Sequence, residues 1–228
     1  MSTFFLRKNI ICWIASVIST VFVCGVFIYT FILSQTKIVD VNVWFYFLVS
    51  EDTRVEAGAE FIKLDGGAGY LLRNNGKDYV VLSVYLEEND GEMVREALAK
   101  QGKATRVLSV GIQRLYLKLS KDKKKANIYA RAFHCLQSYM KVLTEAASNL
   151  EKGGTQEACK RMIQPLIRQL LFLSEQYQEL YPAFAKLCRG TANSLAQISN
   201  ETVYVKDLRY LLCEWAEKTV ILATKFSL

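Results

Sequence analysis

The sequence predicts an α+β protein with one N-terminal transmembrane helix, a βαββαβ domain and a C-terminal antiparallel helical bundle. Three observations predict this class. Residues 10–33 contain no charged residue, residues 43–119 switch between strand-like and helix-like patterns, and the remainder is helical in pattern. The predicted divisions are a cytoplasmic stub (1–9), a transmembrane helix (10–33), a linker (34–42), the βαββαβ domain (43–119) and a helical domain (120–228).

The uncharged stretch of residues 10–33 predicts a membrane anchor. It is long enough to cross a bilayer and longer than the core of a signal peptide. No clear small-x-small cleavage site follows it, so we expect the anchor to remain uncleaved. Arg7 and Lys8 precede it, and the charges behind it nearly cancel. The positive-inside rule then predicts a single-pass membrane protein with a cytoplasmic N-terminus and residues 38–228 extracytoplasmic.

Residues 43–110 follow the order strand, helix, strand, strand, helix, strand. The first strand, residues 43–50, is aromatic and β-branched, as a half-buried pleated surface requires. Asn75-Gly76 is a strong hairpin signal between the second and third strands. Gly102 ends the second helix before the last strand. This order is typical of the ferredoxin-like sandwich, which has two helices on one face of its sheet and an open face opposite.

Alternation along two strands predicts what the open face carries. One set of alternate residues in the first strand is purely hydrophobic, and we expect that set to face the core. The opposite set, with one side of the third strand, then places four aromatic side chains on the open face. They are Trp44, Tyr46, Tyr79 and Tyr85. Exposed amphipathic aromatics form a candidate binding platform. The alternative is that the C-terminal helices cover this face and bury the rings.

The C-terminal region predicts four helices joined by short links. Apolar residues recur every three or four positions from residue 133 onward, as in helices that pack on one another. Gly153-Gly154 separates the first two helices, and Pro165 predicts a kink or break in the second. Gly190 is expected to interrupt the third. Short links favour an antiparallel bundle.

Charge and cysteine content limit the possible functions without identifying one. The net charge is +7, and residues 121–228 carry most of it, with 16 basic and 10 acidic residues. Such a surplus favours polyanionic partners or simply keeps basic helices soluble. The four cysteines of this region contain no C-x-x-C motif, so two disulfides and four buried free thiols both remain open. They are Cys135, Cys159, Cys188 and Cys213.

Catalytic motifs are lacking in the sequence. His134 is the single histidine, and no triad or metal-ligand spacing accompanies it. The acidic residues 87–90 are expected to cap the helix that follows them. Residues 66–69 are glycine-rich, but they follow a helix and precede a strand, which is the reverse of a phosphate-binding loop. We therefore predict no enzyme activity, no cofactor, no metal site and no nucleic-acid partner.

Residues 43–110 resemble the SPOR domain, a bacterial module that binds peptidoglycan. The first strand (45–50), the hairpin and strand at 75–82, and the helix, glycine and last strand at 92–107 carry this resemblance. The resemblance implies that the open sheet binds glycan strands stripped of stem peptides, and that the protein gathers at the division septum. It also implies that the glycan-binding residues are Trp44, Tyr46, Tyr79 and Tyr85.

The leading hypothesis is therefore a membrane-anchored bacterial cell-envelope protein that binds peptidoglycan glycan strands. The alternative is a non-enzymatic interaction or scaffold membrane protein whose SPOR-like domain has lost glycan binding. In that case the helices of residues 123–228 dock a membrane or envelope protein partner. An RNA-recognition module is disfavoured, because residues 77–85 lack the Lys/Arg-Gly-aromatic pattern of such modules.

Overall fold

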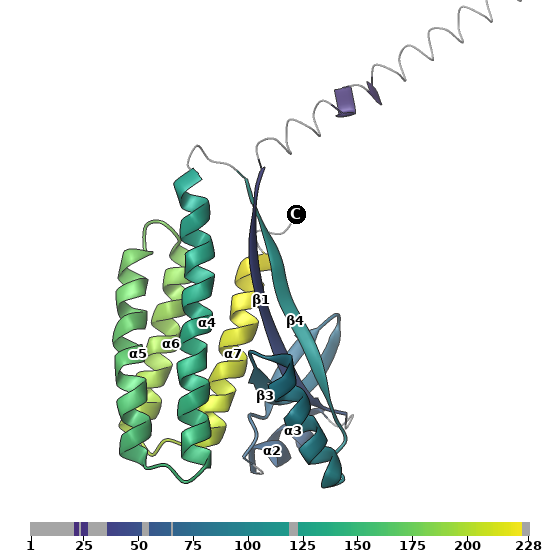
Figure 1. The fold of residues 1–228 in the computed structure, drawn as a ribbon, viewed down its shortest axis with the longest axis vertical. Coiled ribbons are helices and arrows are strands. Elements are labelled where there is room, and N and C mark those ends of the chain that lie inside the picture. Colours follow the sequence, from purple (N-terminus) through teal and green to yellow (C-terminus); the bar gives the residue numbers. More distant parts are fainter. Residues whose placement is uncertain are drawn as a thin grey trace, which may run out of the picture.

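A computed structural model describes residues 21–22, 24–26, 36–51, 55–64, 66–118 and 123–224 of the chain. Its first part follows the order β1, α2, β2, β3, α3, β4, and four long helices follow (Figure 1). The first part comprises β1 (Thr36–Ser50), α2 (Val55–Leu64), β2 (Tyr70–Asn74), β3 (Lys77–Tyr85), α3 (Glu88–Lys100) and β4 (Thr105–Lys118). The second part comprises α4 (Lys123–Glu151), α5 (Gln156–Gln176), α6 (Pro182–Asn200) and α7 (Val205–Thr224).

The four strands form one antiparallel sheet in the order β2-β3-β1-β4. The predicted hairpin is confirmed: Asn75, with φ of 50°, and Gly76, with φ of 74°, turn β2 into β3. β1 and β4 pair from Thr36 opposite Lys118 to Ser50 opposite Thr105. β3 pairs with β1 only over residues 46–49 of β1, so β1 and β4 continue beyond it as a long two-stranded ribbon (Figure 1).

The predicted fold class needs correction in its membrane part. Among the residues that the structure describes, no helix has the length and apolar character needed to span a bilayer. Within the predicted anchor at 10–33, only residues 21–22 and 24–26 are described, and both pieces are helical. The rest of that segment lies outside the described residues.

The expectation of an open sheet face is also wrong. The apolar side of β1 is fully buried and packs on α4, while α7 lies against β3 and β4; all belong to one continuous core with residues such as Phe133, Leu136 and Leu208. We call this side the bundle face; its β1 members are Val43, Phe45, Phe47 and Val49. Burying each such side chain stabilises the fold by about 1.5–3 kcal/mol, so an apolar face of this extent favours a covering layer.

The opposite side of the sheet carries α2 and α3, and we call it the α2/α3 face. A Cβ placed on Gly58 of α2 would lie 3.8 Å from Val80 Cγ2. A Cβ placed on Gly91 of α3 would lie 3.4 Å from both Tyr85 and Val107. Leu48 is buried on this side of β1, opposite Val107 of β4. The described chain is therefore a four-stranded antiparallel sheet with helices on both faces.

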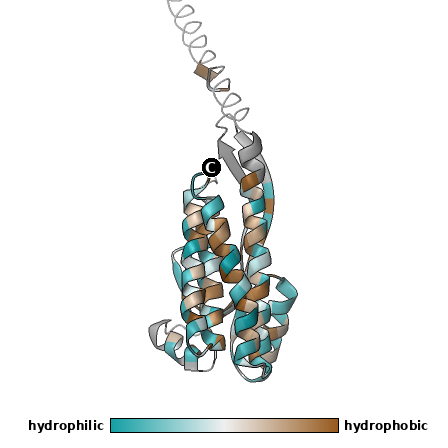
Figure 2. Cartoon of the chain, turned by 90° about the vertical axis from the view of Figure 1, so that its left-hand side faces the viewer, coloured by the Kyte–Doolittle hydropathy of each residue, from teal (hydrophilic) through white to brown (hydrophobic). Residues whose placement is uncertain are grey.

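The helical region forms a bundle in which α4 and α7 lie against the sheet, while α5 and α6 lie farther out (Figure 1). α5 runs without a break through Pro165, an exposed residue, so the carbonyl that loses its helical partner there can bond to water. α6 likewise runs through Gly190. Figure 2 shows hydrophilic and hydrophobic residues interspersed along the helices of the bundle.

Candidate binding groove

The four predicted platform aromatics do not share one face of the sheet. Tyr46 and Tyr85 are direct cross-strand partners, and Trp44 lies on the same side of β1, two residues before Tyr46. A bulge in β3 separates Tyr79 from them. Leu48 pairs with Ser83 but the next residue of β1, Val49, pairs with Val81, so alternation along β3 reverses at this point. Tyr79 therefore lies on the bundle face.

Three of these four rings are partly covered. Tyr85 lies under α3, and burial raises the pKa of its hydroxyl above the usual value. Tyr79 packs against the core of the bundle, with the guanidinium of Arg106 5.1 Å from its ring centroid. Tyr46 is half-buried. Trp44 is 39% exposed and its six-membered ring lies over Gly111, where a Cβ would come within 2.1 Å of Trp44 Cε3.

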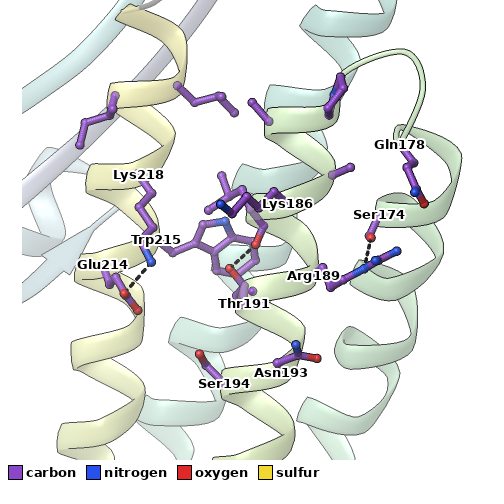
Figure 3. A pocket seen from close by; sticks show the side chains of 17 residues that line it. Ser174, Gln178, Lys186, Arg189, Thr191, Asn193, Ser194, Glu214, Trp215 and Lys218 are labelled. Atoms are coloured by element: carbon purple, nitrogen blue, oxygen red, sulfur yellow. Dashed lines mark hydrogen bonds and ion pairs between the residues drawn. The ribbon is translucent and has the colours of Figure 1, made fainter.

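A concave surface lies elsewhere, between α6 and α7. A hollow of about 710 Å³ opens there and reaches the end of α5 (Figure 3). Residues that line it include Lys186, Arg189, Gly190, Trp215, Lys218 and Ile221. A second hollow of about 520 Å³ continues along the same two helices and shares Ser194 and Glu214 with the first. We call the two together the α6–α7 groove.

One stripe of each helix lines the groove. On α7 the lining residues recur every three or four positions, from Asp207 through Leu211, Glu214 and Lys218 to Ile221. Residues at this spacing lie on one side of a helix. On α6 the lining residues are mostly small or polar, although Leu187 and Ile198 also line the groove. One stripe along the helix contains only small and polar residues. They are Ala183, Lys186, Gly190, Ser194 and Gln197. The sequence did not lead us to predict this groove. The signal for it was the scarcity of apolar residues along this stripe of α6.

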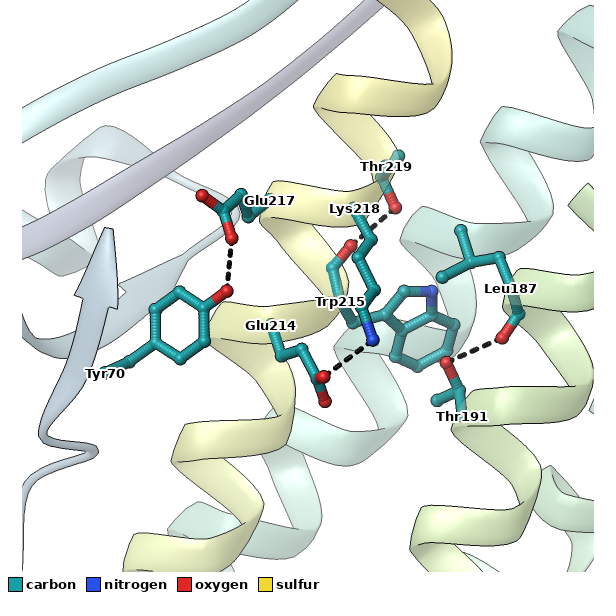
Figure 4. A network of polar contacts seen from close by, with 8 residues as sticks. All are labelled: Tyr70, Leu187, Thr191, Glu214, Trp215, Glu217, Lys218 and Thr219. Carbon is teal, nitrogen blue, oxygen red and sulfur yellow. Dashed lines mark hydrogen bonds and ion pairs between the residues drawn. The ribbon is translucent and has the colours of Figure 1, made fainter. Parts of the chain in front are cut away.

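The floor of the groove contains a buried polar atom. Trp215 is 1% exposed and lies between α7 and α6 (Figure 3). Its indole Nε1 has no hydrogen-bond partner within the part of the chain that the structure describes. Nearby hydroxyls are used within their own helices: Thr191 Oγ1 donates to Leu187 O at 3.0 Å, and Thr219 Oγ1 donates to Trp215 O at 2.8 Å (Figure 4). A buried N–H without an acceptor is rare and calls for an explanation.

The two halves of the groove differ in charge. The half beside the start of α6 carries three basic residues, Lys186, Arg189 and Lys218, and one acidic residue, Glu214. Lys218 Nζ donates to Glu214 Oε1 at 2.6 Å, and Arg189 Nε donates to Ser174 Oγ at 3.1 Å (Figure 3). This half therefore has a net charge of +2.

The other half of the groove is aromatic and carries no basic surplus, with a net charge of −1 when the shared Glu214 is counted. Besides the shared Glu214, two basic residues, Lys63 and Lys206, face two acidic residues, Glu201 and Asp207. The exposed rings of Tyr204 and Tyr210 line this half. Lys206 Nζ lies 5.5 Å from the Tyr204 centroid, and Lys63 Nζ lies 5.3 Å from the Tyr210 centroid. These cation–π contacts hold each ammonium beside an aromatic ring, while the carboxylates of this half offset the charges of the two lysines.

Polar contacts fix α7 on the sheet and thereby fix one wall of the groove. The hydroxyl of Tyr70 on β2 donates a hydrogen bond to Glu217 Oε2 (Figure 4). Burial and the Glu217 carboxylate raise the pKa of Tyr70 far above its usual value. Arg209 Nη1 donates to Gly66 O at 2.9 Å, and its Nη2 donates to Glu151 at 2.8 Å. α7 thus presents one side to the sheet and another to the groove.

The other candidate sites from the sequence are not drawn together. His134 is exposed on α4, and the acidic residues Glu87, Glu88 and Asp90 are exposed at the start of α3. No group of three or more potential metal ligands occurs in the described ranges.

The described C-terminal cysteines are free thiols, which settles the alternative that the sequence left open. Cys159, Cys188 and Cys213 are buried within the helices of the bundle, and Cys135 is half-buried. Burial, with a smaller contribution from Cys135, raises the pKa of Cys188 to about 12. A thiol with so high a pKa is a weak nucleophile at neutral pH, so it suits packing better than catalysis.

Comparison with known proteins gives no match to a protein family, to a curated protein or to a solved structure. The SPOR resemblance, the peptidoglycan partner and the predicted cellular location therefore stay predictions.

Proposed function

We propose that this protein acts by binding rather than catalysis, as a scaffold whose α6–α7 groove docks a segment of a partner protein. The observation that carries this proposal is the groove itself, which runs along two helices and combines apolar residues, exposed tyrosines and a charged rim. Grooves between helices are a recurring means of holding a partner's helix. The covered sheet supports the same choice, because both of its faces already carry helices of this chain.

Two exposed apolar residues of the bundle provide a matched test. Ile221 lines the groove and is 50% exposed, while Phe172 on α5 does not line it and is 57% exposed. We would express the full chain at native level with Ile221→Asp, Phe172→Asp or neither change, and crosslink in the cell. We expect wild type and Phe172→Asp to give the same crosslinked partner, and Ile221→Asp to lose it. Equal thermal unfolding of the two variants is the control for folding.

Two outcomes would count against this proposal. If all three proteins give the same adducts, the groove is not the docking site. If the wild-type chain is recovered only as a monomer, the scaffold function itself is wrong.

A second candidate function is glycan binding centred on Trp44. One specific observation favours it: the exposed Trp44 ring lies over Gly111, so its outer surface is available for stacking on the apolar face of a sugar ring. The test is retention of the full chain on peptidoglycan, intact and stripped of stem peptides. Retention that Trp44→Ala abolishes and Tyr79→Phe preserves would support this candidate, and no retention by folded wild type would exclude it.

A further inference from the structure

We propose that the partner segment is an amphipathic α-helix whose acidic residues lie over the first half of α6. This inference rests on the proposed function and specifies the chemistry of the partner. The geometry points to it through the length of the groove, the space at Gly190, the uneven charge of the rim and the unpaired donor of Trp215.

The groove has the length of a helix. Its lining runs from Pro182 to Glu201 along α6 and from Tyr204 to Leu222 along α7. At 1.5 Å per residue, about 18 residues correspond to roughly 27 Å, or five helical turns. A compact small molecule would occupy only a fraction of this length. A partner helix with apolar residues three and four positions apart could contact both walls throughout.

Gly190 allows a partner backbone to come close in the middle of the positive half. A Cβ at this position would meet no atom within 4 Å, so the space above the helix is open. Ala183 and Ser194 lie on the same stripe, and their side chains are also small. The small side chains on this stripe of α6 leave room for a partner. On the opposite side of the groove, Ile221 and Leu222 of α7 supply apolar contacts for it.

The charge of the rim selects acidic residues at one end of the partner. Lys186 is exposed, and only Nε of Arg189 hydrogen-bonds to another described side chain, Ser174. A guanidinium has further N–H groups, and these can donate hydrogen bonds to a carboxylate. The far half of the groove has no basic surplus, so the attraction for acidic residues is confined to the half beside the start of α6.

Trp215 Nε1 is an independent sign of a missing acceptor in the same half. It is a buried donor without a partner among the described residues, in a side chain that lines the same half of the groove as Lys218 and Gly190. Because Nε1 has almost no exposed surface, an acceptor brought by the partner, such as a carboxylate or an amide oxygen, would reach it only after the Trp215 ring turns toward the groove. Thr191 and Thr219 donate to carbonyls of their own helices, and neither hydroxyl accepts from Nε1 in the structure.

The experiment uses three synthetic 18-residue peptides with leucine at alternating three- and four-residue spacing. They are identical except at three positions near one end, which are Glu, Gln or Lys. A second set carries these positions near the other end, because the helix can enter in either direction. Binding to the full-length protein is measured by fluorescence anisotropy at low salt. We expect the Glu peptide to bind roughly tenfold more tightly than the Lys peptide, as for a few exposed ion pairs.

Variants locate the effect. The double variant Lys186→Glu/Arg189→Glu should bind the Lys peptide more tightly than the Glu peptide. The control Lys141→Glu/Arg168→Glu changes two residues outside the groove and should still bind the Glu peptide more tightly. Gly190→Leu should abolish binding of every peptide. If Glu, Gln and Lys peptides bind alike and Gly190→Leu still abolishes binding, the acidic-helix inference is overturned while docking in the groove stands. If folded wild type binds no peptide, the inference also fails, and the in-cell crosslinking series judges the proposed function separately.

Discussion

The hydroxyl of Tyr70 on β2 donates a hydrogen bond to the carboxylate of Glu217 on α7, although the two residues are 147 positions apart. The same tyrosine packs edge-on against Tyr210, with ring centroids 5.1 Å apart. These contacts join the edge of the sheet to the last helix. Since α7 is also one wall of the groove, the sheet and the groove are mechanically connected through this helix.

Replacing Tyr70 by Phe should destabilise the protein while keeping its fold. The substitution removes the hydroxyl but preserves the ring, so Glu217 is left partly buried without this donor. Loss of one partner of such a hydrogen bond costs about 1–3 kcal/mol. Urea unfolding followed by circular dichroism should show this decrease. Tyr204→Phe, at an exposed ring, is the control and should leave the midpoint unchanged.

Tyr70 should also make stability fall at alkaline pH. Its pKa in the folded protein is raised above its usual value of 10.0 by burial and by Glu217. A raised pKa means that the folded state favours the protonated hydroxyl. The contribution of Tyr70 to the free energy of unfolding is therefore complete below pH 10 and is lost as the pH rises above that value. Unfolding free energies measured from pH 8 to 11 should decline less steeply in Tyr70→Phe than in wild type, and identical slopes would contradict the assignment.

Gly190→Ala should stabilise α6. The glycine lies in the helix interior, and an added Cβ would meet no atom within 4 Å. Alanine favours the helix over glycine by about 0.5–1 kcal/mol. Thermal unfolding should therefore shift upward. An unchanged or lower midpoint would show that the space above Gly190 is already occupied in solution.

Gly111→Ala should have the opposite effect. Its Cβ would come within 2.1 Å of Trp44 Cε3, so the indole would have to leave its place over β4. Because Trp44 is partly exposed, the ring can swing outward, and we expect a loss of roughly 1–3 kcal/mol. Chemical unfolding gives the size of this loss. Gly111→Ala in a Trp44→Ala background should cost much less, because the ring that clashes is absent.

Short sequence patterns predicted much of the secondary structure. Asn75-Gly76 predicted its hairpin because two successive positive φ angles demand such residues. Thr155 is the N-cap of α5, and its side chain accepts from the Ala158 N–H at 3.2 Å. In contrast, Pro165 did not break its helix, because its exposed position lets solvent replace the lost hydrogen bond.

Short sequence patterns could not predict the α6–α7 groove or the positions of the aromatic residues on the sheet. The bulge beside Leu82 turns Tyr79 away from Tyr85, and it arises from how β3 pairs with β1 rather than from β3 alone. Both sides of β1 are apolar, so the strand by itself does not say which layer will cover it. The polar stripe of α6 becomes a groove only when α7 lies opposite it.

The sequence by itself determined where turns, caps and most helices and strands occur, because these depend on the backbone preferences of a few neighbouring residues. Only the tertiary structure decided that α4 and α7 cover the sheet, that Tyr70 meets Glu217 and that α6 and α7 leave a groove between them. Those outcomes depend on how much apolar surface each packing buries, and the residues that contribute to it are far apart in the chain.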